Sequence, residues 1–186
     1  MKNYILLLFA FFLQIAYSCE SKKVVINREV ESKKDGPMLL GRQSADQFQK
    51  EPYSGWFSEE FNEYPIDDAA VAELKKQKIS SYQITAFVGT WCEDTHRELP
   101  RLLKILEAAN YPKEKLNIIA VNRKMESPSG EEGLYNIKKV PTIIVKKYGR
   151  ELGRITETPK SGYLERDLAE ILRTDDGNSV GNIFKK

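Results

Sequence analysis

The stretch Gly89-Thr90-Trp91-Cys92-Glu93-Asp94-Thr95 decides the fold of this chain. It lies between a strand-like run at residues 82–88 and a helix-like run at residues 93–109. The first backbone N–H groups of a helix favour a thiolate, which is the form of sulfur that attacks disulfides. The position of Cys92 therefore predicts a chemically active sulfur at the start of a helix.

The residues around Cys92 resemble the thioredoxin superfamily, in which a tryptophan and a cysteine open the motif Trp-Cys-X-X-Cys. Pro100 follows Cys92 by eight residues, as does the proline that bends the active-site helix in that family. Two departures matter. Thr95 stands where the family has its second cysteine, and Ala86 stands where thioredoxins bury an aspartate.

A second part of the resemblance lies further along the chain, at Val140-Pro141-Thr142. In the family a cis proline at this place faces the cysteine, and the residue before it offers backbone groups to an extended substrate. Gly149 follows Pro141 by eight residues, which also matches. The resemblance spans roughly residues 67–172.

The order of predicted elements agrees with that family. The patterns predict helices at 67–78, 93–109 and 132–138, strands at 82–88, 116–121, 142–147 and 151–156, and a last helix capped by Ser161. A parallel βαβ unit followed by an antiparallel hairpin and a helix is the thioredoxin arrangement. We therefore expect a thioredoxin-like three-layer α/β/α fold, with a central mixed sheet and flanking helices, in which Gly149-Arg150 turns the hairpin.

The first residues are expected to form an export signal. Residues 4–16 form an apolar run broken only by Gln14, and Ser18 then precedes Cys19. Residues 1–18 are read as a signal peptide, too short for a stable membrane span. The end of this segment resembles a bacterial lipoprotein signal, which implies lipidation of Cys19; ordinary cleavage after Ser18 and an uncleaved anchor are the alternatives.

Four segments follow the signal peptide. Residues 19–36 are expected to be a flexible tether, because residues 20–36 include nine charged residues of seventeen. An aromatic-rich extension at 37–66 either covers one edge of the sheet or forms a platform for a hydrophobic substrate near the thiol. The thioredoxin-like domain is expected at 67–173 and a loose tail at 174–186.

Composition limits the partners. The chain of 186 residues carries 29 Lys and Arg against 27 Asp and Glu, a formal net charge of +2. This balance gives no footprint for nucleic acid. His96 lies four residues after Cys92 on one helical face, but two ligands are too few for a metal site, so no metal or cofactor is expected.

The proposed chemistry uses one thiol. Cys92 is the expected nucleophile, and the Thr95 hydroxyl is expected to donate a hydrogen bond to its sulfur. The resemblance implies that Trp91, Val140 and Pro141 bind the substrate. Because a single thiol forms a mixed disulfide but cannot resolve it, an external thiol donor is required.

Two main functions follow for a protein exported to the cell envelope, facing the periplasm on a lipid anchor. One is a monothiol thiol–disulfide oxidoreductase acting on protein disulfides or on mixed disulfides with small thiols. The other is a non-catalytic binding module, a holdase or assembly subunit, that uses the same surface. A redox sensor oxidised at Cys92 is a third reading.

Overall fold

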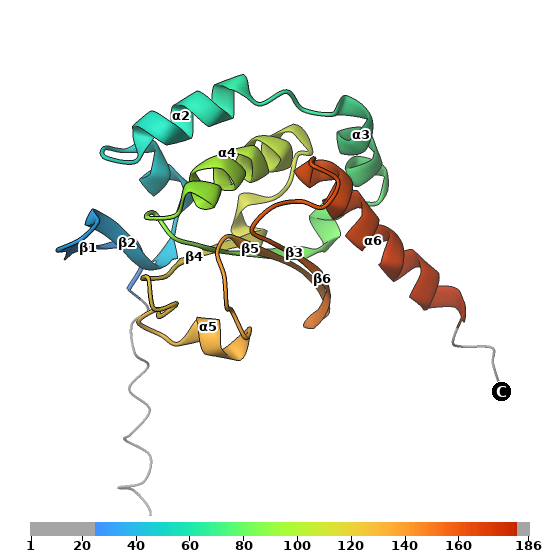
Figure 1. The fold of residues 1–186 in the computed structure, drawn as a ribbon. Helices are drawn as coiled ribbons and strands as arrows, with labels where there is room; N and C mark the ends of the chain where they lie inside the picture. Colours follow the sequence, from blue (N-terminus) through green and yellow to red (C-terminus); the bar gives the residue numbers. More distant parts are fainter. Residues whose placement is uncertain (1–24, 182–186) are drawn as a thin grey trace, which may run out of the picture.

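The computed structural model describes the backbone of residues 25–181 and the side chains of residues 25–175. It contains a six-stranded mixed sheet in the order β1-β2-β4-β3-β5-β6 (Figure 1). The strands are β1 (Arg28–Ser32), β2 (Gly36–Gln43), β3 (Gln83–Val88), β4 (Leu116–Ala120), β5 (Thr142–Lys147) and β6 (Arg150–Thr156). The helices are α2 (Ser54–Glu63), α3 (Asp68–Lys76), α4 (Glu93–Ala108), α5 (Glu131–Leu134) and α6 (Leu164–Gly181), with short 3-10 helices at Ala45–Gln49, Ile79–Ser81 and Lys113–Lys115.

The central four strands have the expected arrangement. β3 pairs with β4 in parallel, and α4 connects the two strands. β5 pairs antiparallel with both β3 and β6, after which the chain enters α6. The predicted mixed α/β fold, a central sheet with flanking helices, is confirmed.

Apolar side chains on both faces of the sheet hold the layers together. In Figure 1, α2, α3, α4 and α6 lie on one side of the sheet and α5 lies on the other. The larger core, on the α4 side, includes Leu74, Ile84, Leu102 and Leu168. A smaller cluster on the α5 side consists of Phe87, Ile119, Val121, Ile137, Val140 and Ile144, with Trp91 and Cys92 packed against it. This second cluster supports the residues around the cysteine.

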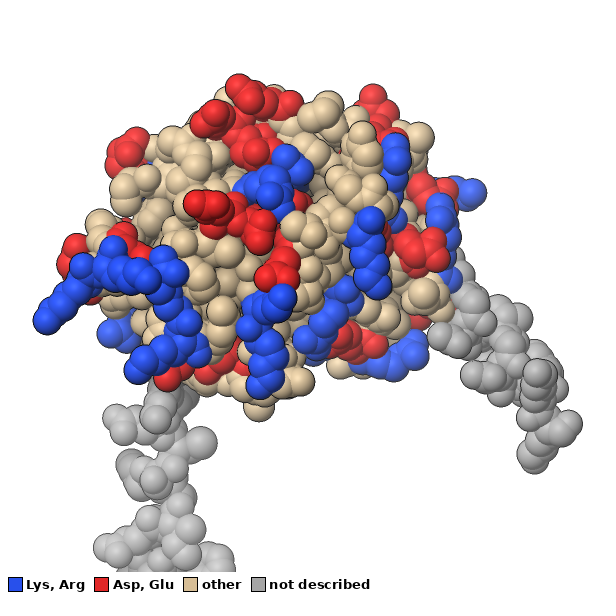
Figure 2. Space-filling model, viewed as in Figure 1, with Lys and Arg blue, Asp and Glu red and all other residues tan. Residues whose placement is uncertain are grey.

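The predicted tether is wrong for its described second half. β1 and β2 form an antiparallel hairpin, and β2 pairs with β4 at the edge of the sheet. The charged residues of β1 are tolerated because it is an edge strand with mostly exposed side chains. Figure 2 shows Lys and Arg side chains over this hairpin, at the lower left.

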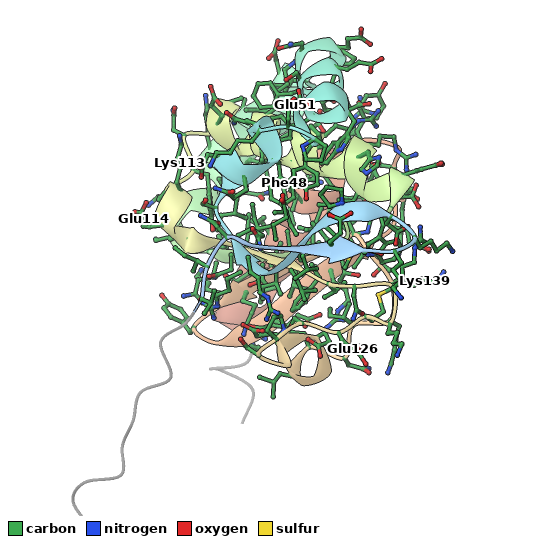
Figure 3. The ribbon with its side chains drawn as sticks, turned by 90° about the vertical axis from the view of Figure 1, so that its left-hand side faces the viewer. Phe48, Glu51, Lys113, Glu114, Glu126 and Lys139 are labelled. Atoms are coloured by element: carbon green, nitrogen blue, oxygen red, sulfur yellow. The ribbon has the colours of Figure 1, made fainter. Side chains whose placement is uncertain are left out.

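The segment 37–66 covers the sheet in two ways: its first residues form β2 and pair with β4, and its aromatic residues pack into the core on the α4 side. Phe48, labelled in Figure 3, is fully buried, and Tyr53, Phe57 and Tyr64 are buried with it. Arg101 on α4 binds Glu60 on α2 at 2.6 Å. This extension is an integral part of the larger core.

The predicted loose tail is also wrong in its described part. α6 continues through Gly181, past the expected end at residue 173. Asp175 is buried and its carboxylate accepts hydrogen bonds from Lys147 at 2.6 Å and from Tyr82 at 3.2 Å. These contacts fix the helix to β5 and to the residue before β3.

Smaller differences concern element ends. The hairpin turn is Tyr148-Gly149, since both have positive φ, +50° and +79°. The helices α3 and α5 end earlier than expected, at Lys76 and Leu134. Among the described residues, no helix is long and apolar enough to cross a bilayer. The predicted signal peptide and Cys19 lie outside the described residues.

Candidate functional site

Cys92 lies where β3 ends and α4 begins. It is the N-cap residue of α4, with φ −108° and ψ 120°, and its side chain is partly exposed. The thiol donates a hydrogen bond to the carbonyl oxygen of Val140, with a sulfur–oxygen distance of 3.2 Å. The Val140–Pro141 peptide bond is cis. The structure therefore brings together Cys92, Val140 and Pro141, which are far apart in the sequence.

Trp91 is held against the backbone on the other side of the cysteine. Its Nε1 donates to the carbonyl of Val121 at 2.9 Å. A Cβ atom at Gly89 would lie only 2.7 Å from the Trp91 ring, so glycine is needed for the ring to pack there. Trp91 is partly exposed, and one edge of the site is formed by its indole.

Thr95 does not have the expected contact. Its side chain is fully buried, and its hydroxyl oxygen accepts a hydrogen bond from the backbone N–H of Gly89 at 3.2 Å. No hydrogen bond between Thr95 and the Cys92 sulfur occurs among the contacts of the described chain. The hydroxyl instead closes the loop that carries Trp91 and Cys92, because the N–H of the residue after β3 needs an acceptor.

His96 holds the same loop from outside. Its Nε2 lies 2.8 Å from the carbonyl oxygen of Thr90, which can only accept, so this nitrogen carries the hydrogen. The imidazole stacks on the indole of Trp56, with ring centroids 4.4 Å apart. His96 thus connects α2 to the residue two before Cys92. Sequence reasoning considered His96 for its spacing from Cys92 and missed its partner in the aromatic segment.

Sequence reasoning also missed an ion pair beside Trp91, formed by Arg123 and Asp35. The guanidinium of Arg123 lies over the Trp91 ring, 4.8 Å from its centroid. Its nitrogen atoms donate three hydrogen bonds to the Asp35 carboxylate, at 2.7 to 2.9 Å. These bonds raise the pKa of Arg123, and the negative charge of an ionised Cys92 adds to the effect. Arg123 follows β4, and the loops after neighbouring parallel strands meet at one end of a sheet, a signal that could have found it.

A second ion pair lies beyond the cis proline. The backbone N–H of Glu157 donates to the carbonyl of Pro141 at 2.7 Å, and its carboxylate binds Lys139 at 2.7 Å. Lys139, labelled in Figure 3, is exposed at the surface. Charged side chains therefore occur on both sides of the cysteine, from the loop after β4 and from the segment before β5.

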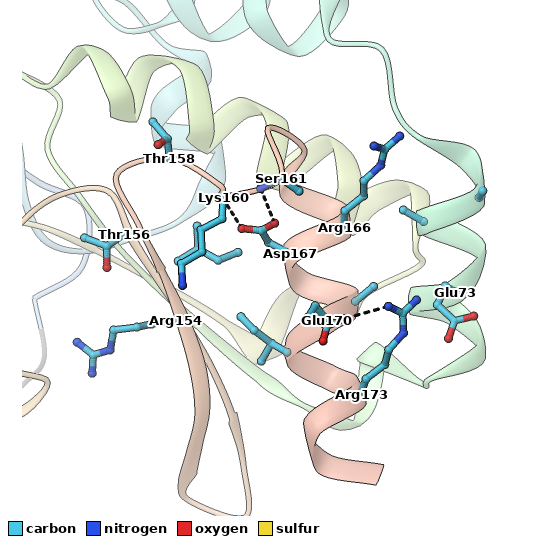
Figure 4. A pocket seen from close by; sticks show the side chains of 15 residues that line it. Glu73, Arg154, Thr156, Thr158, Lys160, Ser161, Arg166, Asp167, Glu170 and Arg173 are labelled. Atoms are coloured by element: carbon cyan, nitrogen blue, oxygen red, sulfur yellow. Dashed lines mark hydrogen bonds and ion pairs between the residues drawn. The ribbon is translucent and has the colours of Figure 1, made fainter. Parts of the chain in front are cut away.

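A large cavity lies elsewhere on the molecule. It has a volume of about 1020 Å³ and lies between α3, α6 and β6 (Figure 4). Several charged groups in its wall are already paired, such as Arg173 with Glu170 and the Asp167 carboxylate with the backbone N–H groups of Lys160 and Ser161. None of the predicted site residues lines it. Within residues 25–175, no cluster of three or more His, Cys, Asp or Glu side chains could hold a metal ion.

Comparison with known proteins gives no family assignment. No family model matches the chain, and no curated protein matches it. Among solved structures, a protein of unknown function from Pseudomonas aeruginosa is similar at 16% identity and TM-score 0.48, over 67% of this chain and 84% of that one.

Thioredoxins are also among the similar structures. Mitochondrial thioredoxin 3 from Saccharomyces cerevisiae has 22% identity and TM-score 0.33, covering 49% of this chain and 82% of its own. Thioredoxin O2 from Arabidopsis thaliana has 18% identity and TM-score 0.34, and the match covers 59% of this chain and 81% of that thioredoxin. The thioredoxin-like arrangement of this chain is supported by its own strand order and cis proline.

Proposed function

We propose that this protein is a monothiol thiol–disulfide exchange protein of the cell envelope, with Cys92 as the nucleophile. One observation carries the proposal: Cys92 is a partly exposed residue, and its sulfur lies 3.2 Å from the carbonyl oxygen that precedes the cis proline. A helix start favours the thiolate, and the neighbouring backbone is suited to an extended substrate. In this proposal Cys92 is the nucleophile, and the backbone before the cis proline is where an extended substrate would pair.

The reaction needs no cofactor. The Cys92 thiolate attacks one sulfur of a substrate disulfide, a Cys92–substrate disulfide forms, and the other sulfur leaves as a thiolate. The second step needs a thiol from outside, because Thr95 replaces the resolving cysteine and Cys92 is the one free cysteine in the described chain. The external thiol attacks the substrate sulfur of the Cys92–substrate disulfide, forms a new disulfide with it, and releases Cys92 as a thiolate.

Val140, Pro141 and Trp91 are assigned to substrate binding. The Val140 carbonyl accepts a hydrogen bond from the Cys92 thiol. A substrate N–H that replaces the thiol as the donor to this carbonyl would align the substrate with the sulfur. The Trp91 indole, held by Val121, provides an apolar wall beside it. Partners of this surface are a protein with a disulfide or a mixed disulfide of a small thiol.

Export and a lipid anchor at Cys19 complete the proposal. They place the thiol in the envelope, where disulfides persist. Mass spectrometry of the amino-terminal peptide from membranes tests the anchor. A diacylglyceryl group on Cys19 is expected, and a free thiol at an unmodified Cys19 contradicts it.

The catalytic claim is tested by turnover of a glutathionylated peptide with excess reduced glutathione. Native protein is expected to accelerate the release of the peptide thiol at least tenfold over the same solution with Cys92→Ser. The control variant is Thr158→Ser, an equally small change at an exposed position outside the site, and it is expected to behave as native. Equal rates for native protein and Cys92→Ser remove the claim.

A binding module remains the second candidate, and one observation favours it. No acid or base side chain contacts the Cys92 sulfur among the described residues, since His96 directs Nε2 at the Thr90 carbonyl. Alkylation of Cys92 distinguishes the two functions. It abolishes exchange, whereas a module that binds without chemistry keeps its partner.

A further inference from the structure

Arg123 is fixed beside the reactive sulfur by two neighbours. Trp91 lies under its guanidinium, and the Trp91 indole is itself anchored to the Val121 carbonyl. Asp35, from the turn between β1 and β2, accepts hydrogen bonds from the Nε and Nη2 atoms of Arg123. The guanidinium is therefore held in one orientation, near enough to Cys92 for the charge of an ionised sulfur to contribute to the raised pKa of Arg123.

The Asp35 contact shows which ligand this arginine fits. Two carboxylate oxygens meet two guanidinium nitrogens, which is the bidentate geometry in which arginine recognises carboxylates. The Arg123 side chain is 43% exposed and so within reach of an incoming carboxylate, which would have to displace the Asp35 side chain, itself 12% exposed, from the turn at the sheet edge. The contact joins residues 88 positions apart, so it is not a local feature of one loop.

We propose that Arg123 is a specificity-determining residue that binds a carboxylate of the substrate, and that Asp35 occupies this subsite in the free protein. This inference rests on the proposed function of Cys92. The substrate class is a disulfide with a carboxylate a few ångströms from the sulfur that Cys92 attacks. An incoming carboxylate replaces Asp35 on Arg123.

The surrounding charge supports an anionic substrate. Lys33 and Lys34 precede Asp35 at the hairpin turn, and Lys124 follows Arg123. All three are exposed and have no ion pair among the described residues. Their positive charge attracts a carboxylate to this side of the site and compensates for the thiolate.

The exchange step is balanced without an added oxidant. Cys92 as thiolate forms a bond to the substrate sulfur nearest the bound carboxylate, the substrate S–S bond breaks, and the other half of the substrate leaves as a thiolate. Asp35 becomes solvated when the substrate carboxylate binds Arg123. No electron is gained or lost overall.

The test uses three small disulfides of similar size: 3,3′-dithiodipropionate (anionic), 2-hydroxyethyl disulfide (neutral) and cystamine (cationic). Second-order rate constants for adduct formation are measured on the full chain at constant ionic strength, with the adduct mapped to Cys92 by peptide mass spectrometry. The ratio of the anionic to the cationic rate constant is compared between variants.

We expect Arg123→Gln to lower this ratio roughly three- to fivefold and Asp35→Asn to raise it by a similar factor, as for an exposed charge contact. The double variant decides the matter, because Asp35→Asn should give no increase once Arg123 is replaced. Two controls make the same change of charge at other positions. Glu31→Gln, on the same hairpin, is the control for Asp35→Asn, and Arg173→Gln, on α6, is the control for Arg123→Gln. Neither control should change the ratio by more than about 1.5-fold. An equal increase from Asp35→Asn with and without Arg123 overturns the inference.

A second measurement separates this inference from the proposed function. Cys92→Ser protein is titrated with dithiodipropionate and cystamine while the indole N–H signal of Trp91 is followed by NMR. A shift with the anion that disappears in Cys92→Ser/Arg123→Gln supports the subsite even if Cys92 has no exchange activity. In the variant Cys92→Ser/Asp35→Asn, Arg123 no longer has its internal partner. If dithiodipropionate does not shift the Trp91 signal of this variant either, the subsite is contradicted.

Discussion

At the scale of single residues, Thr95 shows how the loop around the sulfur is built. The residue is fully buried, and its oxygen is the acceptor for the N–H that follows the strand leading to Cys92. Its role in the described structure is to position the loop, and its place in the motif leaves Cys92 without an internal resolving thiol. The same residue thus explains both the geometry and the need for an external donor.

Thr95→Val removes the acceptor while it keeps the side-chain shape. The buried N–H of Gly89 is left unpaired, so the free energy of unfolding should fall by about 1–3 kcal/mol. Thr156→Val, at an exposed position on the edge strand β6, should change it by less than about 0.5 kcal/mol. Urea unfolding measures both variants, and similar costs would show that the Thr95 hydrogen bond contributes nothing.

Glu98 is a second buried polar residue of α4, and its contribution to stability should depend on pH. Burial raises the pKa of this carboxyl, although Arg97 and Arg101 oppose the shift. A raised pKa in the folded state stabilises the protein at low pH, and this contribution is lost as the pH rises through the folded pKa. Glu98→Gln should therefore gain stability relative to the native protein between pH 4 and pH 7.

The comparison for Glu98 is Glu107→Gln, an exposed glutamate on the same helix. Urea midpoints of the three proteins are measured across the pH range. The quantity compared is the stability of Glu98→Gln minus that of the native protein at each pH. If this difference stays constant or shrinks toward pH 7, Glu98 is not a buried carboxyl with a raised pKa.

The residues that sequence reasoning found and missed differ in a physical way. The proximity of Cys92 to Val140 and Pro141 could be predicted because each belongs to a short pattern with a fixed place in the resembled fold. Asp35 was missed because its segment is rich in charge, which predicted a solvated tether rather than a strand turn. Trp56 was missed as a partner of His96 because ring stacking between two helices has no sequence period.

At the scale of elements, α2 is the addition that supports the start of α4. It contacts α4 through Trp56 on His96 and through Glu60 on Arg101. Lys104 of α4 also donates to the carbonyls of Asn62 and Tyr64, at 3.0 and 2.8 Å. The helix is therefore fixed to α4 at both of its ends.

Phe57→Ala should show that α2 belongs to the core. Phe57 is 3% exposed, and truncation of a buried phenylalanine costs about 3–5 kcal/mol. Phe61→Ala, one helical turn later and only partly buried, should cost clearly less. Both are measured by urea unfolding, and equal small costs would mean that α2 is not docked as described.

The predictability of the elements follows their burial. β3 to β6 and α4 were predicted within a residue or two because apolar residues recur at strand or helix spacing. β1 was not predicted, because this exposed edge strand carries charged side chains. β2 lies inside the sheet but was not predicted either, because its apolar run covers only residues 38–40 and lies between Pro37 and Gly41. A strand or helix that is buried on one or two faces has a recognisable spacing of apolar residues, whereas a solvent-exposed edge strand does not.

At the scale of the whole molecule, the carboxyl-terminal helix fastens the sheet. Lys147 at the end of β5 and Tyr82 before β3 both donate to the buried Asp175. Sequence reasoning ended the domain at residue 173 because polar residues follow, and polarity alone does not reveal an ion pair formed across the fold.

Asp175→Asn should destabilise the protein by about 1.5–3 kcal/mol at pH 7, the value of a hydrogen bond to a charged group. The Lys147 hydrogen bond lowers the pKa of Asp175, so its contribution is present above the ordinary value of 3.8 and lost as the pH falls through the folded pKa. Glu170→Gln, in an exposed pair on the same helix, should cost less than about 1 kcal/mol. A cost for Asp175→Asn that persists unchanged at a pH well below the ordinary aspartate pKa contradicts this assignment.

The central claim is that folding makes the Cys92 sulfur a nucleophile. The most direct test is the rate constant for adduct formation between Cys92 and 2-hydroxyethyl disulfide at pH 7, in the folded chain and in the same chain unfolded by urea, mapped by peptide mass spectrometry. A helix start that favours the thiolate should make the folded protein react at least a few times faster. A folded protein that reacts more slowly than the unfolded chain contradicts the claim.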